Sequence, residues 1–332
     1  MLFSIVTPSC GNNKLEKLLE CINSQDLGDN NQIEIEHIIV VDGDKYSEKC
    51  KEIVNKVPPN KGINRYVVYL PFNTGANKFL GHKIYASFTQ LVNGDWVFLF
   101  DDDNYFDNNH ILSFYELIKS REKTDWLYSL RKIVNDNGYV CNDDCESLGY
   151  LRHVFYNSNE HLIDTNCYCI RTDIMIKLSP IWNRIGLNNV NDPDRLFGKY
   201  LMENCLDYDC TRKYTVNYYV GNRENSVKDT LFIYGNSIIN KLYNDIPWNR
   251  EILYIAYKDN NQTERFINNV NIINNIDILK DKYLISAFTK YIPNNITLFI
   301  FKNYLEEENP LEIDRLLNNN SIKKYIYLLN FV

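Results

Sequence analysis

Short apolar runs alternate with amphipathic segments through the first hundred residues. Runs rich in branched and aromatic side chains predict strands at Leu2–Thr7, Ile33–Asp42, Tyr66–Leu70 and Asp95–Phe100. The segments between them carry apolar residues at helical spacing and predict helices at Lys14–Asn23, Tyr46–Val54 and Lys78–Leu91. Alternation of this kind requires crossover connections between parallel strands. The sequence therefore predicts an α/β fold with a mostly parallel central sheet flanked by helices.

Three of these predicted strands end in polar residues. The polar groups are Thr7-Pro8-Ser9, Asp42-Gly43-Asp44 and Asp101–Asp103. Ligands of open α/β sheets bind outside the carboxyl ends of the strands. We therefore expect the three loops to converge on one crevice.

The most distinctive of these groups is the run of three acids that follows the apolar strand. Asp101, Asp102 and Asp103 come directly after Trp96–Phe100. Carboxylates packed side by side repel one another unless a positive charge lies between them. Mg²⁺ or Mn²⁺ would supply that charge and would leave coordination positions open for phosphate. A solvated acidic turn is the alternative, and the strand in front of the acids weighs against it.

Composition limits the other classes of function. The chain has 332 residues, of which 45% are hydrophobic and 24% charged, as is usual for globular proteins. The net charge of −7, without any basic stripe, argues against binding to nucleic acid. No apolar run approaches the length of a transmembrane helix, and the N-terminus begins directly with a predicted strand and not with a signal peptide.

The cysteines indicate the compartment. There are nine, an odd number, and none forms a CxxC pair or has histidine at zinc-finger spacing. Free thiols in a reducing compartment, the cytoplasm, are the favoured interpretation. The abundance of Asn, Ile, Lys and Tyr indicates an AT-rich genome, and if the source is viral this would be the host cytoplasm.

The rest of the chain has a mixed character. A hairpin is predicted from Trp126–Val134 to Tyr139–Val140, strands at Thr165–Arg171 and Tyr214–Val220, and a helix at Asp194–Asn204. Residues 241–332 predict a small α/β or helical C-terminal extension, which could bind acceptor, dimerise or merely pack. The boundary near residue 240 is not marked by a linker.

The strand-end motifs, in their order and spacing, resemble glycosyltransferase family 2. The matching segments are Phe3–Ser9, Ile39–Gly43 and Gly94–Asp103. The resemblance implies the GT-A fold, a Rossmann-like α/β domain that binds nucleotide sugars, over residues 1–240. Residues 1–105 would form its nucleotide-sugar half and residues 106–240 its acceptor half.

The resemblance also implies roles in donor binding. Thr7 and Pro8, with Ser9 in the same turn, would border the nucleobase and ribose, and Asp42 would hydrogen-bond the base, usually uracil. Where the family often has an Arg-Asn pair, this chain has Gly81-His82-Lys83. Lys83, or Lys78 one turn earlier, would support the acids or a phosphate, with exposed helix lysines as the alternative. His82 would cover the sheet edge.

The acids match the family's DxD motif. By the resemblance, Asp103 would bind the metal directly, Asp101 would contact ribose or metal-bound water as the second metal residue, and Asp102 would fill the middle position. A third ligand, commonly a histidine near the end of the domain, is not visible. Asn222 and Arg223 lie near that place but are poor substitutes.

The acceptor side is less well marked. The family's catalytic base is an acid at the start of a helix, which here matches Asp194 or Asp192, with a role in helix capping as the alternative. Asp164-Thr165-Asn166 resembles the acceptor-binding edge. Trp182 would either stack on a sugar ring or pack in the core.

These roles add up to a metal-dependent, inverting, hexosyltransferase-type glycosyltransferase. It would move a sugar from a nucleotide-diphosphate sugar, most simply a UDP-sugar, to a hydroxyl of a glycan, protein or lipid-linked acceptor, with Mn²⁺ or Mg²⁺. One rival is a nucleotidyltransferase, although the turn after the first strand, 7–13, has a single glycine and no basic residue. The other is an inactive GT-A module that binds a glycan or a partner. The sequence does not specify the oligomeric state.

Overall fold

The computed structural model describes residues 1–28, 32–75, 80–121, 123–149, 162–184, 193–221 and 226–236. The chain divides into two compact units. The first comprises Met1–Asn142 and Leu162–Tyr219, and the second Asp143–His161 and Val220–Val332. All the strands below belong to the first unit. The predicted boundary near residue 240 and the predicted extension, 241–332, lie outside the described residues.

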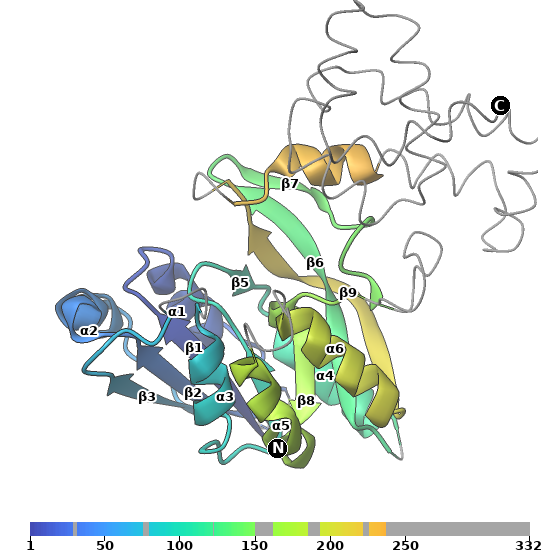
Figure 1. The fold of residues 1–332 in the computed structure, drawn as a ribbon, viewed down its shortest axis with the longest axis horizontal. Helices are drawn as coiled ribbons and strands as arrows, with labels where there is room; N and C mark the ends of the chain where they lie inside the picture. The colour runs from blue at the N-terminus through green and yellow to red at the C-terminus, as the bar shows by residue number, and fades with distance from the viewer. Residues whose placement is uncertain are drawn as a thin grey trace, which may run out of the picture. The chain divides into compact units, whose positions relative to one another are not determined.

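One half of the sheet is parallel, as the alternating sequence predicts (Figure 1). Its strands are β3 (Ile63–Tyr69), β2 (Glu34–Val41), β1 (Leu2–Ser9) and β4 (Trp96–Leu99), in that spatial order. β1 lies between β2 and β4 and pairs in parallel with both. The buried pattern of β1 and β2 is nearly continuous, which is typical of strands covered on both faces.

The other half of the sheet is mixed. Beyond β4 come β8 (Tyr168–Arg171), β6 (Trp126–Asn135), β9 (Tyr208–Tyr219) and β5 (Tyr105–Phe106), while β7 (Gly138–Asn142) forms the predicted hairpin with β6. β8 is antiparallel to both of its neighbours, and β6 runs parallel to β9. The predicted fold class, α/β with a mostly parallel central sheet flanked by helices, is confirmed, and the parallel pairing is continuous from β3 to β4.

Helices cover the sheet. They are α1 (Leu15–Asn23), α2 (Ser47–Lys56), α3 (His82–Phe88), α4 (His110–Lys119), α5 (Thr172–Leu178) and α6 (Pro193–Asn204). In Figure 1, α3, α5 and α6 lie on the near side of the sheet and α1 and α4 on the far side. α1 buries Leu15, Leu18, Leu19 and Ile22, the residues that its apolar spacing selects.

Some elements differ from the prediction. The segment predicted as a strand at Thr165–Arg171 begins as a 3-10 helix, Thr165–Cys167, because the Asp164 side chain accepts a hydrogen bond from the Asn166 backbone N–H. The helix predicted at Lys78–Leu91 is described as the shorter α3, and residues 76–79 lie outside the description. The prediction missed α4, α5 and β5, which are short or partly polar.

A buried histidine lies within the aromatic core between β4 and α4. His110 is fully buried and stacks on Phe106 at 4.6 Å between ring centroids, with Phe98 and Phe114 on its other sides. Its Nδ1 lies 2.7 Å from the Thr215 hydroxyl. Burial lowers the pKa of His110 from 6.5 to about 3, so the ring is neutral near pH 7.

This pKa shift predicts a loss of stability in acid. Between pH 7 and pH 5 the unfolded chain protonates its histidines while folded His110 stays neutral, so the free energy of unfolding should fall by about 2 kcal/mol through His110 alone. Urea unfolding at both pH values should show a smaller fall for His110→Gln than for the wild type. Equal falls in the two proteins would contradict the assignment.

Two findings bear on the cysteines and on membranes. No disulfide joins any of the nine cysteines, all of which lie in the part of the chain that the structure describes. Among the helices that the structure describes, none is both long and apolar enough to cross a bilayer.

Candidate active site

The parallel pairing brings the ends of β1, β2 and β4 to one edge of the sheet. Ser9 pairs with Val41 in the β1–β2 register, and Val6 pairs with Leu99 in the β1–β4 register. The Asp42 backbone N–H donates to the Ser9 carbonyl at 2.8 Å. The three polar strand ends predicted to converge therefore lie on neighbouring strands.

The middle aspartate fastens β4 to β1. The Ser9 hydroxyl donates to Asp102 Oδ2 at 2.6 Å, and the Cys10 backbone N–H donates to the same oxygen at 3.3 Å. Ser9 Oγ in turn accepts the Gly11 N–H at 3.1 Å, which shapes the turn after β1. Asp102 is 8% exposed, and burial raises its pKa to about 6. Its carboxylate thus holds the strand ends together.

Asp42 holds a neighbouring turn. Its two carboxylate oxygens accept hydrogen bonds from the Thr74 N–H at 2.6 Å, the Gly75 N–H at 3.1 Å and the Asn73 amide at 3.1 Å. Asp42 is 2% exposed. The predicted hydrogen bond from Asp42 to a nucleobase stays a prediction, and the structure shows a carboxylate that organises residues 73–75.

The first turn is closely packed. Thr7 is fully buried, and its hydroxyl lies 3.1 Å from His37 Nε2, so the Thr7 side chain packs against β2. Pro8 contacts the start of α3, where a Cβ added to Gly81 would lie only 2.7 Å from Pro8 Cγ. Glycine at position 81 therefore allows α3 to approach the end of β1.

Asp101 is held by two neutral donors. The Tyr85 hydroxyl donates to its Oδ1 at 2.8 Å, and the Asn166 amide donates to its Oδ2 at 3.1 Å. Burial, followed by repulsion from Asp103, raises the pKa of Asp101 to about 7 despite these two hydrogen bonds. Asp103 also helps to raise the pKa of Asp102. Asp103 therefore lies close enough to repel both of the other carboxylates.

The N-terminal part of the chain is similar to a known protein family. Residues 4–144 match the family model for glycosyl transferase family 2. The match covers the strand ends of β1, β2 and β4, and it confirms both the predicted resemblance and the predicted enzyme class, a glycosyltransferase.

Solved structures give weaker similarities. TarS 1–349 of S. aureus in complex with UDP is 18% identical, with 93% of each chain covered and a TM-score of 0.48. The same fragment in complex with UDP-GlcNAc is 16% identical over 92% of this chain and 89% of its own, with a TM-score of 0.46. No curated protein sequence is significantly similar to this chain. The similarity to glycosyl transferase family 2 rests on the sequence match alone.

Trp182 lies in the core. Trp182 is fully buried and packs on His82 at 5.3 Å, Tyr85 at 5.5 Å and Phe197 at 4.9 Å between ring centroids. Of the two predicted roles, core packing is the one found. Burial lowers the pKa of His82 to about 4, so this ring packs as a neutral group.

Two more of the predicted residues, Lys83 and Asp194, lie near the starts of helices. Lys83 is the second residue of α3, which also carries Tyr85. Asp194 follows Pro193 at the start of α6 and accepts the Arg195 N–H at 2.8 Å. Its charge, with that of Asp164, helps to raise the pKa of the buried Tyr168 hydroxyl, after burial itself. Among the other predicted residues, Asp192, Lys78, Asn222 and Arg223 lie outside the described part of the chain.

Two residues that contact Asp101 were not predicted to do so from the sequence. Tyr85 gives no sequence signal beyond its place in a predicted helix, and Asn166 was expected at an acceptor-binding edge. Asn166 is 1% exposed and Tyr85 is 1% exposed, and both face Asp101. A tyrosine on the helix before the acidic strand becomes informative only when the fold places that helix beside the strand end.

The carboxylates at this edge of the sheet are the groups that would have to hold a divalent cation. No three His, Cys, Asp or Glu side chains among the described residues converge into a set able to hold a metal alone. Mg²⁺ and Mn²⁺ accept carboxylate oxygens and complete their coordination with phosphate and water. Burial and, after it, repulsion from Asp103 raise the pKa values of Asp101 and Asp102, and a cation beside these carboxylates would offset that repulsion.

The hydrogen bond from Ser9 to Asp102, which links β1 to the end of β4, can be tested by removing the Ser9 hydroxyl. Ser9→Ala leaves a buried Asp102 oxygen short of its strongest hydrogen bond and should lower the free energy of unfolding by about 1–3 kcal/mol. Ser120→Ala, which removes an exposed hydroxyl at the end of α4, is the matched control and should change it by less than about 0.5 kcal/mol. Equal effects in urea unfolding would show that the Ser9–Asp102 contact has no special weight.

Proposed function

We propose that the chain transfers a sugar from a nucleotide-diphosphate sugar, with UDP as the nucleotide, to an acceptor hydroxyl in a metal-dependent reaction that inverts the anomeric carbon. The observation that carries the proposal is the placement of Asp101–Asp103 at the end of β4, beside the ends of β1 and β2, within the segment that matches the family. Sheet edges of this type are where α/β domains bind ligands.

Asp103 and Asp101 are the residues that would hold the cation. The ion would neutralise the diphosphate and so stabilise its departure as the leaving group. Asp101 is fixed by Tyr85 and Asn166, so its carboxylate is oriented before donor binds. Asp102 serves the site through the turn at Ser9 and Cys10.

The acceptor requires a base. Asp194, half-buried at the start of α6, or Asp192 would accept the proton of the attacking hydroxyl. One displacement at the anomeric carbon forms the bond to the acceptor oxygen as the bond to the diphosphate breaks. A single step of this kind inverts the configuration, with the proton on the aspartate.

The donor site predicts nucleotide-dependent stabilisation. UDP, GDP, CDP and TDP should be compared by melting temperature, each with and without Mn²⁺. We expect UDP with Mn²⁺ to raise the melting temperature by about 5 °C at 100 times its Kd. Asp103→Ala should abolish the rise, whereas Asp173→Ala, an exposed acid paired with Arg171, should keep it.

The outcomes of this panel separate the rival functions. Stabilisation by another nucleotide would keep the transferase and change the donor. No stabilisation by any diphosphate would overturn the donor site and favour an inactive module. A rise in melting temperature that persists in Asp103→Ala would contradict the assignment of Asp103 to the metal.

The base predicts a split between binding and turnover. Asp194→Asn should slow release of UDP from UDP-hexoses by about 100-fold while the affinity for UDP with Mn²⁺ stays as in the wild type. The same measurement on Asp192→Asn identifies which acid is the base, since only one of the two should show the large fall. Wild-type rates in both variants would show that neither aspartate is the catalytic base.

A further inference from the structure

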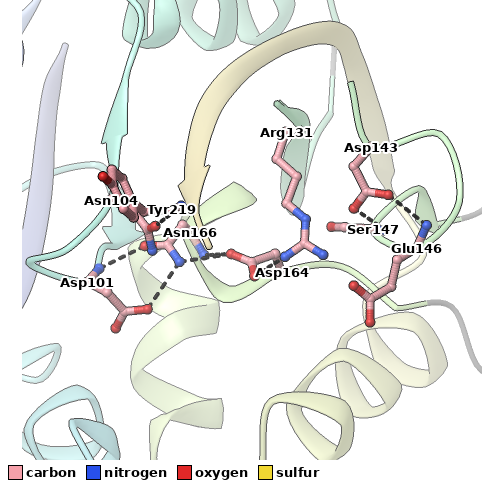
Figure 2. A network of polar contacts seen from close by, with 9 residues as sticks. All are labelled: Asp101, Asn104, Arg131, Asp143, Glu146, Ser147, Asp164, Asn166 and Tyr219. Atoms are coloured by element: carbon pink, nitrogen blue, oxygen red, sulfur yellow. Dashed lines mark hydrogen bonds and ion pairs between the residues drawn. The ribbon is translucent and has the colours of Figure 1, made fainter. Parts of the chain in front are cut away.

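Asn166 occupies a buried position at which its side chain bonds to both neighbouring acids. It is 1% exposed, and its amide lies between Asp101 and Asp164 (Figure 2). We propose that Asn166 is a positioning residue for Asp101, and that the ion pair Arg131–Asp164 fixes the orientation in which Asn166 holds it. The inference rests on the proposed function, because Asp101 matters through the metal-bound donor.

The hydrogen bonds determine which way the amide faces. Asn166 Oδ1 accepts the Asp101 backbone N–H at 2.8 Å, so Nδ2 must be the atom that faces the acids. Nδ2 donates to Asp101 Oδ2 at 3.1 Å and to Asp164 Oδ1 at 2.8 Å. One side chain thus holds both the backbone and the carboxylate of Asp101.

The ion pair behind Asn166 keeps this arrangement in place. Arg131 Nη1 lies 2.5 Å from Asp164 Oδ2, and the Arg131 side chain is only 4% exposed. The guanidinium also lies over the Tyr218 ring, 4.2 Å from its centroid. Asp164 is therefore held through one oxygen by Arg131 and presents the other to Asn166.

Charge explains why the pair is needed. Asp164 repels Asp101 and helps to raise its pKa, after burial and Asp103. A buried carboxylate that loses its cationic partner is strongly destabilised. Arg131 therefore allows an acid to stand behind Asn166, and that acid in turn orients the amide toward Asp101.

The opposite carboxylate oxygen completes the clamp on Asp101. Tyr85 donates to Oδ1 while Asn166 donates to Oδ2, so rotation of the carboxylate breaks one or both contacts. Residues that orient a metal-binding carboxylate typically change metal affinity by about 10- to 100-fold when they are removed. Asn166 should therefore control how well Asp101 serves the cation.

A second triad in the same unit provides the control. Lys132 Nζ lies 2.5 Å from Asp107 Oδ2, and the Asn217 amide donates to Asp107 Oδ1 at 2.9 Å. It repeats the chemistry of cation, aspartate and buried asparagine, but its asparagine bonds Asp107 and not Asp101. Asn217 is 5% exposed, so its truncation tests the loss of a buried amide alone.

The experiment measures UDP binding by calorimetry over a range of Mn²⁺ concentrations, together with the melting temperature of each protein. Asn166→Ala should raise the Mn²⁺ concentration for half-maximal UDP binding by at least about tenfold. Asn217→Ala should lower the melting temperature comparably and leave that concentration at the wild-type value. Arg131→Met should raise this Mn²⁺ concentration as Asn166→Ala does. Arg131→Lys keeps the positive charge, so its Mn²⁺ concentration should lie close to the wild-type value.

The outcomes are separable. A folded Asn166→Ala with the wild-type Mn²⁺ requirement overturns the inference and leaves the proposed function intact. If this variant fails to fold, Asn166→Thr decides in its place, since its hydroxyl can donate to only one of the two acids and should give a smaller rise. UDP binding by the wild type that does not depend on Mn²⁺ overturns the proposed function, and the inference with it.

Discussion

Carboxylates at the buried edge of a sheet must each receive hydrogen-bond donors, and this requirement organises the domain. Asp102 takes its donors from the turn after β1, Asp42 takes them from residues 73–75, and Asp101 takes them from α3 and from the segment before β8. Each acid thus joins its own strand to a different part of the fold. The acids to which we assign the cation therefore also connect these segments of the fold.

The parallel half of the fold could be predicted because its pattern is local. Continuous apolar runs marked β1, β2 and β4, and the polar residues after them marked the edge of the sheet at which we propose that the donor binds. The mixed half could not be predicted as well. β8 is short and starts from a 3-10 helix, so its alternation reads as a longer strand until the capping by Asp164 is known.

Contacts between segments far apart in the chain could not be predicted from the sequence. Tyr85 and Asp101 are 16 positions apart, and Asn166 and Asp101 are 65 apart, so no spacing rule connects them. Trp182 was open to two interpretations because the sequence does not distinguish a tryptophan that stacks on a sugar from a tryptophan that packs in the core. Complete burial between His82, Tyr85 and Phe197 decides for the core.

Arg131 and Lys132 are consecutive on β6, and successive side chains of a strand point to opposite faces. Each neutralises a different aspartate, Asp164 or Asp107, and each aspartate is also bonded by its own asparagine. The order of the two cations along the strand therefore decides which aspartate each one meets. Loss of one residue before Arg131 would turn its guanidinium to the other face of β6 and leave a flexible ammonium on the side of Asp164. A small deletion far along the chain from the acidic motif would thereby change the side chains that support Asp101.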